Sequence, residues 1–239
     1  RDYYASRGLG DVYKRQMIDT VIFDLDGTLL YTLEDLTEST NRALEHFGSE
    51  KRSLKEVRSF VGNGVKKLIE RSLKDGQKNP RFQECLAYFK EDYAKNMYNK
   101  TKPYEGIPEL LNTLEASGIK TAVVSNKFDL AVKELCKKYF PNNFQCVIGE
   151  SEKVKKKPAP DSVLSVMTQL NAAPERTVYV GDSEVDIQTA QNAGIPCISV
   201  SWGYKDTEFL KENGAQVIVS TPRGFIEELT SLNSRLITG

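Results

Sequence analysis

The chain has 239 residues, of which 39% are hydrophobic and 28% are charged, a balance typical of globular domains. Lysine plus arginine equals aspartate plus glutamate at 33 each, so the charge balance does not indicate the basic surface that nucleic acids need. No apolar run approaches the ~20 residues of a membrane-spanning helix, and a single histidine, His46, excludes a metal site built on several histidines.

The four cysteines are not arranged in Cys-x-x-Cys pairs. We expect them to be reduced core residues of a cytoplasmic protein. They are Cys85, Cys136, Cys146 and Cys197.

The first sixteen residues differ in character from the rest. DVYKRQ, at residues 11–16, is one translation frame of AGATGTGTATAAGAGACAG, which resembles the end of a transposon used to prepare sequencing libraries. We therefore interpret residues 1–16 as a translated adapter and expect the natural chain to begin at Met17. The alternatives are a polar tail and a targeting peptide, although the segment lacks the apolar stretch of a signal peptide.

The next elements are one strand followed by helices. Residues 19–24 form a short run rich in branched apolar residues that ends at a turn signal, which predicts a buried strand. Helical periodicity covers residues 32–47 and stops at Gly48. From there to about Lys102 only helical patterns occur, at residues 53–60, 65–73 and 81–98. The sequence thus predicts an all-helical insert after the first strand.

Strands alternate with helices after Pro103 and Gly106. Strands are predicted at residues 120–124, 144–149, 177–180, 195–201 and 216–219, with helices at 108–118, 128–140, 161–170, 183–194 and at the C-terminus. This alternation is typical of a parallel sheet covered by helices on both faces. The prediction is an α/β core formed by residues 17–30 and 104–239, with the insert at residues 31–103.

Polar side chains gather at the ends of these strands, where open parallel sheets bind their ligands. They are Asp24, Asp26, Ser125, Asn126, Asp182 and, a helical turn later, Asp186; Lys157 lies on a loop before Pro158. Such a set suits phosphoryl transfer. Hard oxygen ligands suit Mg²⁺, one carboxylate can attack phosphorus, and a second can protonate the leaving alcohol. A hydroxyl and a lysine can hold the phosphoryl oxygens.

Each of these residues could also have a purely structural role. The two aspartates of the first strand could simply solubilise its end, and Ser125 could cap a helix. Lys157 could be one charge of a solvated KVKKK segment shared with Lys153, Lys155 and Lys156. Asp186 could stabilise the first turn of its helix, alone or together with a role at the site.

The motifs DLDGT, Ser125-Asn126, Lys157-Pro158 and GDSEVD resemble the four ordered motifs of the haloacid dehalogenase superfamily. The resemblance runs from about residue 18 to 230. The stretches KPYEGIPELLNTLEASGIKTAVVSNK, KKPAPD, GDSEVDIQTAQNAG, VGNGVKKLIERSL and WGYK are similar to its phosphoglycolate phosphatase group. The resemblance implies a Rossmann-like core whose insert is a helical cap.

The resemblance also implies roles for the motif residues. Asp24 would be the nucleophile and Asp26 the general acid/base. The Asp24 carboxylate, the Asp26 carbonyl and Asp182 would hold Mg²⁺, with Asp186 supporting the metal site. Ser125 and Lys157 would bind the phosphoryl group, with Thr28 and Asn126 of the same motifs at the substrate. The chain departs from the family where Tyr31-Thr32 replaces the common Asp-Ser pair.

A substrate carboxylate would need a cationic contact from the cap. Residues 62–64, GNG, are interpreted as a flexible turn that opens a helix with its N–H groups toward an anion. Arg58 is the expected contact; Lys66, Lys67 and Arg71 are further candidates. The alternative for each is a solvated helix face.

The expected function is a Mg²⁺-dependent phosphatase that hydrolyses a small phosphate monoester, phosphoglycolate first, through an aspartyl-phosphate. Alternatives are a related enzyme for a sugar phosphate, a nucleotide or pyrophosphate, and a phosphomutase. A receiver domain is disfavoured by the motif order and chain length, and a non-catalytic binding protein by the intact Asp26. The expected partner is a phosphorylated metabolite, with neither nucleic acid nor membrane, in a monomer or homodimer.

Overall fold

The computed structural model describes residues 17–152 and 154–238. The interpretation of residues 1–16 as an adapter therefore lies outside the described residues. Within them, no helix is long and apolar enough to cross a membrane.

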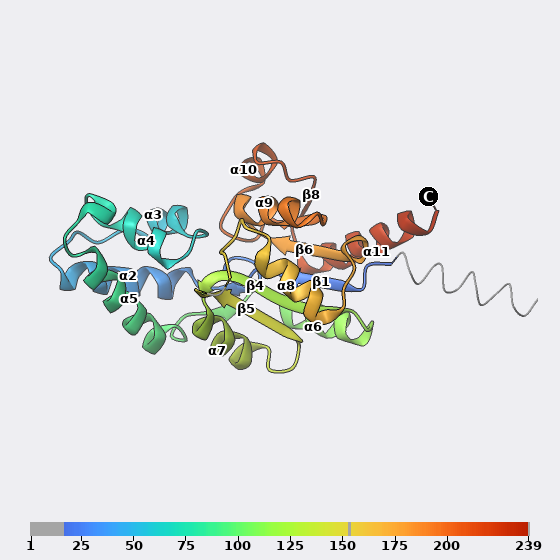
Figure 1. Cartoon of the computed structure of the whole chain (residues 1–239), viewed down its shortest axis with the longest axis horizontal. Helices are drawn as coiled ribbons and strands as arrows, with labels where there is room; N and C mark the ends of the chain where they lie inside the picture. Colours follow the sequence, from blue (N-terminus) through green and yellow to red (C-terminus); the bar gives the residue numbers. More distant parts are fainter. Residues whose placement is uncertain (1–16, 153, 239) are drawn as a thin grey trace, which may run out of the picture.

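A six-stranded sheet lies at the centre of the molecule (Figure 1), with strand order β5-β4-β1-β6-β7-β8. Its strands are β1 (Thr20–Phe23), β4 (Lys120–Phe128), β5 (Cys146–Glu150), β6 (Thr177–Gly181), β7 (Cys197–Val200) and β8 (Val217–Val219). Every neighbouring pair is parallel. The predicted α/β fold with a parallel sheet is confirmed.

The register of the central strands aligns their carboxyl ends. Phe23, the last residue of β1, pairs with Val123 of β4 on one side and with Val180 of β6 on the other. The polar residues that follow each strand therefore emerge at the same edge of the sheet. The motif residues of β1, β4 and β6 gather there for this reason.

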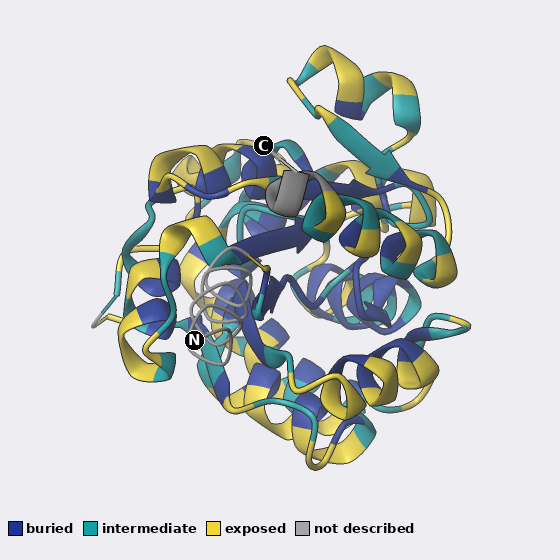
Figure 2. Ribbon diagram, turned by 90° about the vertical axis from the view of Figure 1, so that its right-hand side faces the viewer, coloured by how far each residue is buried: buried dark blue, intermediate teal, exposed yellow. Residues whose placement is uncertain are grey.

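Side chains of β1 alternate between two apolar layers, as the period of a strand requires. Val21 and Phe23 pack in the cluster that includes α6 (Ile107–Ala116), α7 (Asp129–Tyr139) and α11 (Pro222–Thr238). Ile22 packs in a second cluster with α8 (Asp161–Leu170) and α9 (Glu184–Ala193). Figure 2 shows the buried strands inside and the exposed residues on the outer faces of the helices. The sheet is thus covered on both faces.

The helices between β1 and β4 include a separate group, the cap, at one end of the sheet (Figure 1). The cap comprises α2 (Leu33–His46), α3 (Leu54–Phe60), α4 (Val65–Ser72), the short turn η1 (Gly76–Lys78) and α5 (Phe82–Asn96). A capping box formed by Ser53 and Glu56 begins α3. Gly48 and the N-cap Gly64 both have positive φ angles, +69° and +84°, where glycine is favoured.

Two short segments connect the cap to the core. Leu30 and Tyr31 form β2, which pairs antiparallel with β3, Lys102 and Pro103. This ribbon was absent from the sequence prediction because two residues are too few to show a strand period. Three further short elements were missed for the same reason: α10 (Thr207–Glu212), which Asp206 caps, η1 (Gly76–Lys78) and η2 (Pro174–Arg176). The ribbon lies at residues 30–31 and 102–103; the boundaries of the insert at residues 31 and 103 stay a prediction.

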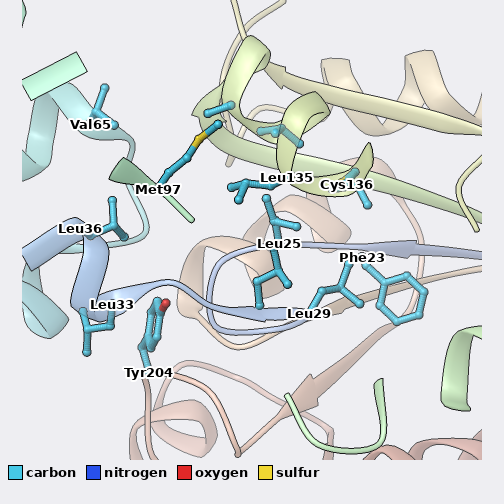
Figure 3. Close-up of a cluster of buried hydrophobic side chains, with 14 of the residues drawn as sticks. Phe23, Leu25, Leu29, Leu33, Leu36, Val65, Met97, Leu135, Cys136 and Tyr204 are labelled. Atoms are coloured by element: carbon cyan, nitrogen blue, oxygen red, sulfur yellow. The ribbon is translucent and has the colours of Figure 1, made fainter. Parts of the chain in front are cut away.

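One hydrophobic cluster extends from the sheet into the cap. Figure 3 shows part of it, from Phe23 and Leu25 at the end of β1 to Leu36 of α2 and Val65 of α4. All four side chains are buried. The cap therefore shares apolar packing with the core.

Candidate active site

The first strand delivers two aspartates to the edge of the sheet that faces the cap. The backbone N–H of Asp24 still donates to Val180 O (2.9 Å), so Asp24 is held in line with β1. The chain then turns at Gly27, whose φ is +83°. A Cβ at this position would collide with the carboxylate of Asp182, so the turn needs glycine for conformation and for space.

The turn after β6 supplies Asp182 and Asp186. Oδ2 of Asp186 accepts hydrogen bonds from Ser183 N (3.1 Å) and Ser183 Oγ (2.6 Å), which caps the start of α9. Its other oxygen, Oδ1, faces the ammonium of Lys157 at 2.7 Å. Asp186 thus both stabilises its helix and holds the lysine.

Asp24, Asp182 and Asp186 form a buried group of carboxylates, with one oxygen from each within 4.8 Å of the others. Burial raises the pKa of Asp24 to about 7, although the neighbouring Lys157 opposes this shift. Burial, together with the charges of Asp186 and Asp24, also holds the pKa of Asp182 well above its usual range. Of the described cations, the ammonium of Lys157 directly contacts this group of three carboxylates.

These oxygens fit a divalent cation. Oδ1 of Asp24 is buried, and its partner among the described residues is Lys157 Nζ, which forms an ion pair with it at 2.9 Å. Asp182 uses Oδ2 to accept from Tyr204 N (2.6 Å), whereas its Oδ1 has only a long contact with Thr28 Oγ1 (3.4 Å). Clustered carboxylate oxygens with spare acceptor capacity suit Mg²⁺.

Lys157 lies under this group. Its Nζ contacts Asp24 Oδ1 (2.9 Å), Asp186 Oδ1 (2.7 Å) and the hydroxyl of Tyr179 (2.9 Å). Burial opposes the charge, yet the two carboxylates hold the pKa of Lys157 well above its usual range. Lys155 and Lys156 are exposed, and Lys153 lies outside the described residues. Of the described lysines in that segment, Lys157 is the one at the site.

The end of β4 contributes Ser125 and Asn126, which both line the cavity. Oγ of Ser125 accepts from Lys127 N at 3.3 Å. The Asn126 amide donates to Lys157 O (3.0 Å) and to Gly62 O of the cap (3.1 Å), and accepts from Lys157 N (2.8 Å). Asn126 therefore ties the loop of the buried lysine to the cap.

Asp26 lies in a different environment from Asp24. Lys127 Nζ contacts both carboxylate oxygens of Asp26, at 3.0 and 2.9 Å, and Thr32 Oγ1 donates to Oδ1 at 2.6 Å. Thr32 in turn bonds the hydroxyl of Tyr204 (2.9 Å). The sequence analysis assigned no role to Lys127, although this residue directly follows Ser125-Asn126 and ends the stretch that is similar to the phosphoglycolate phosphatase group.

A cavity between the sheet edge and the cap brings these groups together. Asp24, Asp26, Ser125, Asn126 and Asp182 line it from the core, beside Lys127 and Ser183. The cap contributes the apolar side chains Leu36, Val61, Val65 and Leu68, with Gly62 and Gly64. Lys157 and Asp186 lie behind the core wall through their contact with Asp24.

Besides Lys157 and Asp186, two further predicted site residues lie outside the cavity lining. Thr28 is fully buried beneath Asp182. Arg58 of α3 turns to the core, where Nε donates to Tyr204 O (2.6 Å) and a terminal nitrogen donates to Gly203 O (3.2 Å). In this structure Arg58 joins cap to core and does not face the cavity.

The other three candidate cations of the cap do not line the cavity either. Lys66 is exposed, and Lys67 pairs with Glu70 at 2.9 Å. Arg71 donates to Phe60 O and to Asn63 Oδ1, both at 2.8 Å. The expected cationic contact from the cap is thus not formed by any of the four candidates.

Comparison with known proteins places this geometry in a family. A family model of haloacid dehalogenase-like hydrolases matches residues 21–200. A phosphoglycolate phosphatase of Aquifex aeolicus is 35% identical over 185 residues, which cover 77% of this chain and 85% of that protein. A phosphoglycolate phosphatase of Pseudomonas putida is 32% identical over 218 residues, covering 89% of this chain and 77% of the relative.

Solved structures of similar proteins lead to the same family. A Lactobacillus delbrueckii subsp. bulgaricus protein, provisionally named phosphoglycolate phosphatase, superposes with a TM-score of 0.85 at 34% identity, covering 89% of this chain and 98% of that one. CbbY of Rhodobacter sphaeroides, solved in complex with phosphate, gives a TM-score of 0.73 at 26% identity over 86% of this chain and 95% of its own. The similarity includes both core and cap.

Proposed function

The chain belongs to the haloacid dehalogenase-like hydrolases, in their phosphoglycolate phosphatase-like group, and on that basis we propose that it is a Mg²⁺-dependent phosphatase that works through an aspartyl-phosphate. Phosphoglycolate is the first-choice substrate, because the relatives of Aquifex aeolicus and Pseudomonas putida carry that name. Phosphatase activity follows from the family; the metal, the intermediate and the substrate are the proposal.

The observation that carries the proposal is the separation of two carboxylates into different environments on one cavity wall. Asp24 lies with Lys157, Asp182 and Asp186, whereas Asp26 lies with Lys127 and Thr32. Paired carboxyl groups in unlike surroundings are suited to unlike roles. The first can act as nucleophile and the second as acid and base.

In the first step, a carboxylate oxygen of Asp24 forms a bond to phosphorus while the bond from phosphorus to the alcohol oxygen breaks. Asp26 gives its proton to that alcohol oxygen, so a neutral alcohol leaves. Ser125 and Lys157 hold the phosphoryl oxygens through this step. Asp24, Asp182 and the Asp26 carbonyl, with Asp186 in support, would hold Mg²⁺, which would supply positive charge to the phosphoryl oxygens.

In the second step, Asp26 accepts a proton from a water molecule as the water oxygen attacks phosphorus. The bond between the Asp24 oxygen and phosphorus breaks, and inorganic phosphate is released. Asp24 returns as a carboxylate and Asp26 as a carboxylic acid, so the cycle is balanced. The cap excludes other water through its apolar face above the cavity.

Phosphate release from a panel of esters tests this proposal. The panel is 2-phosphoglycolate, glucose 6-phosphate, AMP and pyrophosphate, each with Mg²⁺ and with a chelator. We expect turnover that needs the metal and that falls about a thousandfold or more in Asp24→Asn. A folded Asp24→Asn variant with full activity would contradict the role of Asp24.

A second variant separates the role of Asp26 from that of Asp24. p-Nitrophenyl phosphate has a leaving group that needs no protonation. In the Asp26→Asn variant, Asp24 should therefore still be phosphorylated by this ester. Loss of the base should then slow hydrolysis of the intermediate. Mass spectrometry of the acid-quenched variant should show phosphorylated Asp24, and the absence of this adduct despite turnover would contradict the covalent mechanism.

A further inference from the structure

The phosphoryl-transfer steps leave one buried cation of the cavity without a function. Lys127 is 3% exposed, lines the cavity and contacts both oxygens of Asp26. Its Nζ also lies 4.6 Å from the centre of the Tyr93 ring of α5. The ammonium is therefore fixed between the acid/base residue and a ring of the cap.

The cap side of the cavity has no charged side chain among the described lining residues. It presents Leu36, Val61, Val65 and Leu68, together with glycine backbone. The cations of α3 and α4 are paired elsewhere or exposed, as described above. Charge recognition of a leaving group thus has to come from the core side.

Lys205 is the other lysine of the lining, and its position differs from that of Lys127. It is half-buried, and its Nζ lies 5.1 Å from the ring centre of Phe209, a residue that does not line the cavity. Lys127 remains as the buried ammonium beside the point where the leaving group departs. Lys205 serves as a matched control for a lysine in the same wall.

Geometry then sets where a charged group of the substrate would fall. Asp26 must contact the ester oxygen in order to protonate it. Lys127 Nζ lies 2.9 and 3.0 Å from the two Asp26 oxygens. A group one or two carbons from the ester oxygen therefore comes within reach of the ammonium.

We propose that Lys127 is a specificity-determining residue that selects phosphate monoesters whose leaving alcohol carries a carboxylate close to the ester oxygen. The inference rests on the proposed phosphatase function and identifies the side chain that selects the substrate. A substrate carboxylate adds a second negative partner to the buried ammonium that already contacts Asp26, whereas a neutral group of the same size adds none. Lys127, the core residue that follows Ser125-Asn126, thus discriminates between charged and neutral leaving groups.

The test compares two esters of equal length, 2-phosphoglycolate and ethyl phosphate, which differ in whether the second carbon is a carboxylate or a methyl group. The measured quantity is the ratio of kcat/KM for the first to that for the second, with Mg²⁺ present. We expect the wild-type ratio to fall by about tenfold or more in Lys127→Met, since removal of one partner of a buried charge pair is costly. Lys127→Arg should keep part of the ratio, and Lys205→Met should leave it unchanged.

The ratio separates selection from a general effect on Asp26. If Lys127 only supported the acid/base residue, both esters would lose activity equally in Lys127→Met and the ratio would stay at the wild-type value, which would overturn the proposal. Equal efficiency of wild-type protein on the two esters would also overturn it, independently of whether any variant folds. Turnover of neither ester, with turnover of no other monoester, would overturn the proposed function and this inference together.

Discussion

Asp24 has a protonation equilibrium that links the site to stability. Burial raises its pKa from 3.8 to about 7 in the folded chain. Between these values the folded protein binds more protons than the unfolded chain, so the free energy of unfolding falls as the pH rises from about 4 to about 7. Asp182 acts in the same direction because its pKa is also raised.

We therefore expect Asp24→Asn to stabilise the metal-free protein at pH 8, with a rise in Tm of about 5 °C over wild type, and to have little effect at pH 4. Mg²⁺ should reverse the order at pH 8, because it binds the folded wild-type site and stabilises it by mass action. Thermal unfolding followed by circular dichroism, with chelator and with Mg²⁺, measures both effects.

Asp75→Asn is the matched control. Asp75 is exposed and has a φ of +66°, a conformation that asparagine also adopts. It should show neither the pH-dependent gain nor the reversal by Mg²⁺. A metal-free Asp24→Asn protein less stable than wild type at pH 8 would contradict the electrostatic explanation.

At the residue scale, some features of the site could be predicted from the sequence and others could not. Asp24, Ser125 and Asp182 each follow a short apolar run, so their meeting at one sheet edge could be predicted from parallel strands alone. The contact from Lys127 to Asp26 spans 101 residues, and that from Arg58 to Tyr204 spans 146. No local pattern carries such pairings, because they depend on how the cap and the strand ends face each other.

At the scale of elements, the cap loop at residues 62–64 contacts β4, where the Asn126 amide donates to Gly62 O at 3.1 Å. Gly64 has a φ of +84°, and a Cβ there would lie 2.8 Å from Glu150 Oε2 and 3.1 Å from Asn126 O. Gly48 has a similar φ, +69°, with nothing within 4 Å of an added Cβ. The two glycines therefore separate backbone strain from the fit of cap against core.

We expect Gly64→Ala and Gly48→Ala each to lose about 1 kcal/mol of unfolding free energy from the strained backbone. Only Gly64→Ala should also raise KM, because its methyl group pushes the loop away from Asn126 and Glu150. Urea unfolding and steady-state kinetics of both variants check this. Matching KM values in the two variants would show that the loop contact does not matter for substrate binding.

Elements differ in how well the sequence predicts them. The strands β1, β4 and β6 are visible as short apolar runs, and the long helices α2 and α5 as helical periodicity. The ribbon of β2 and β3 could not be predicted, since each strand has two residues and its pairing joins positions more than 70 apart. Helix α10, with six residues, is likewise too short to show a period.

At the scale of the molecule, cap and core share one hydrophobic cluster. It includes Leu25 and Leu135 of the core and Leu36, Val65 and Phe89 of the cap, all buried. A shared apolar interior couples the unfolding of the two parts. We expect one calorimetric transition with equal calorimetric and van't Hoff enthalpies.

Leu36→Ala tests this coupling where the two parts meet. It should lower the stability of the whole protein by about 2–5 kcal/mol while keeping one transition. Leu164→Ala, at a leucine 45% exposed on α8, should change stability by less than about 0.5 kcal/mol. A separate low-temperature transition in Leu36→Ala would instead mean that the cap unfolds on its own.

The central place of β1 has a consequence for biosynthesis. This strand is made before its neighbours β4 and β6, which begin at Lys120 and Thr177. At ribosomal speeds of ~5–20 residues per second, β1 waits roughly 10 to 30 seconds for its second neighbour. Meanwhile Val21, Ile22 and Phe23 have no sheet in which to be buried. A nascent chain therefore acquires its proposed catalytic centre only after Asp182 has been added, and any shorter fragment exposes an apolar strand that favours chaperone binding or aggregation.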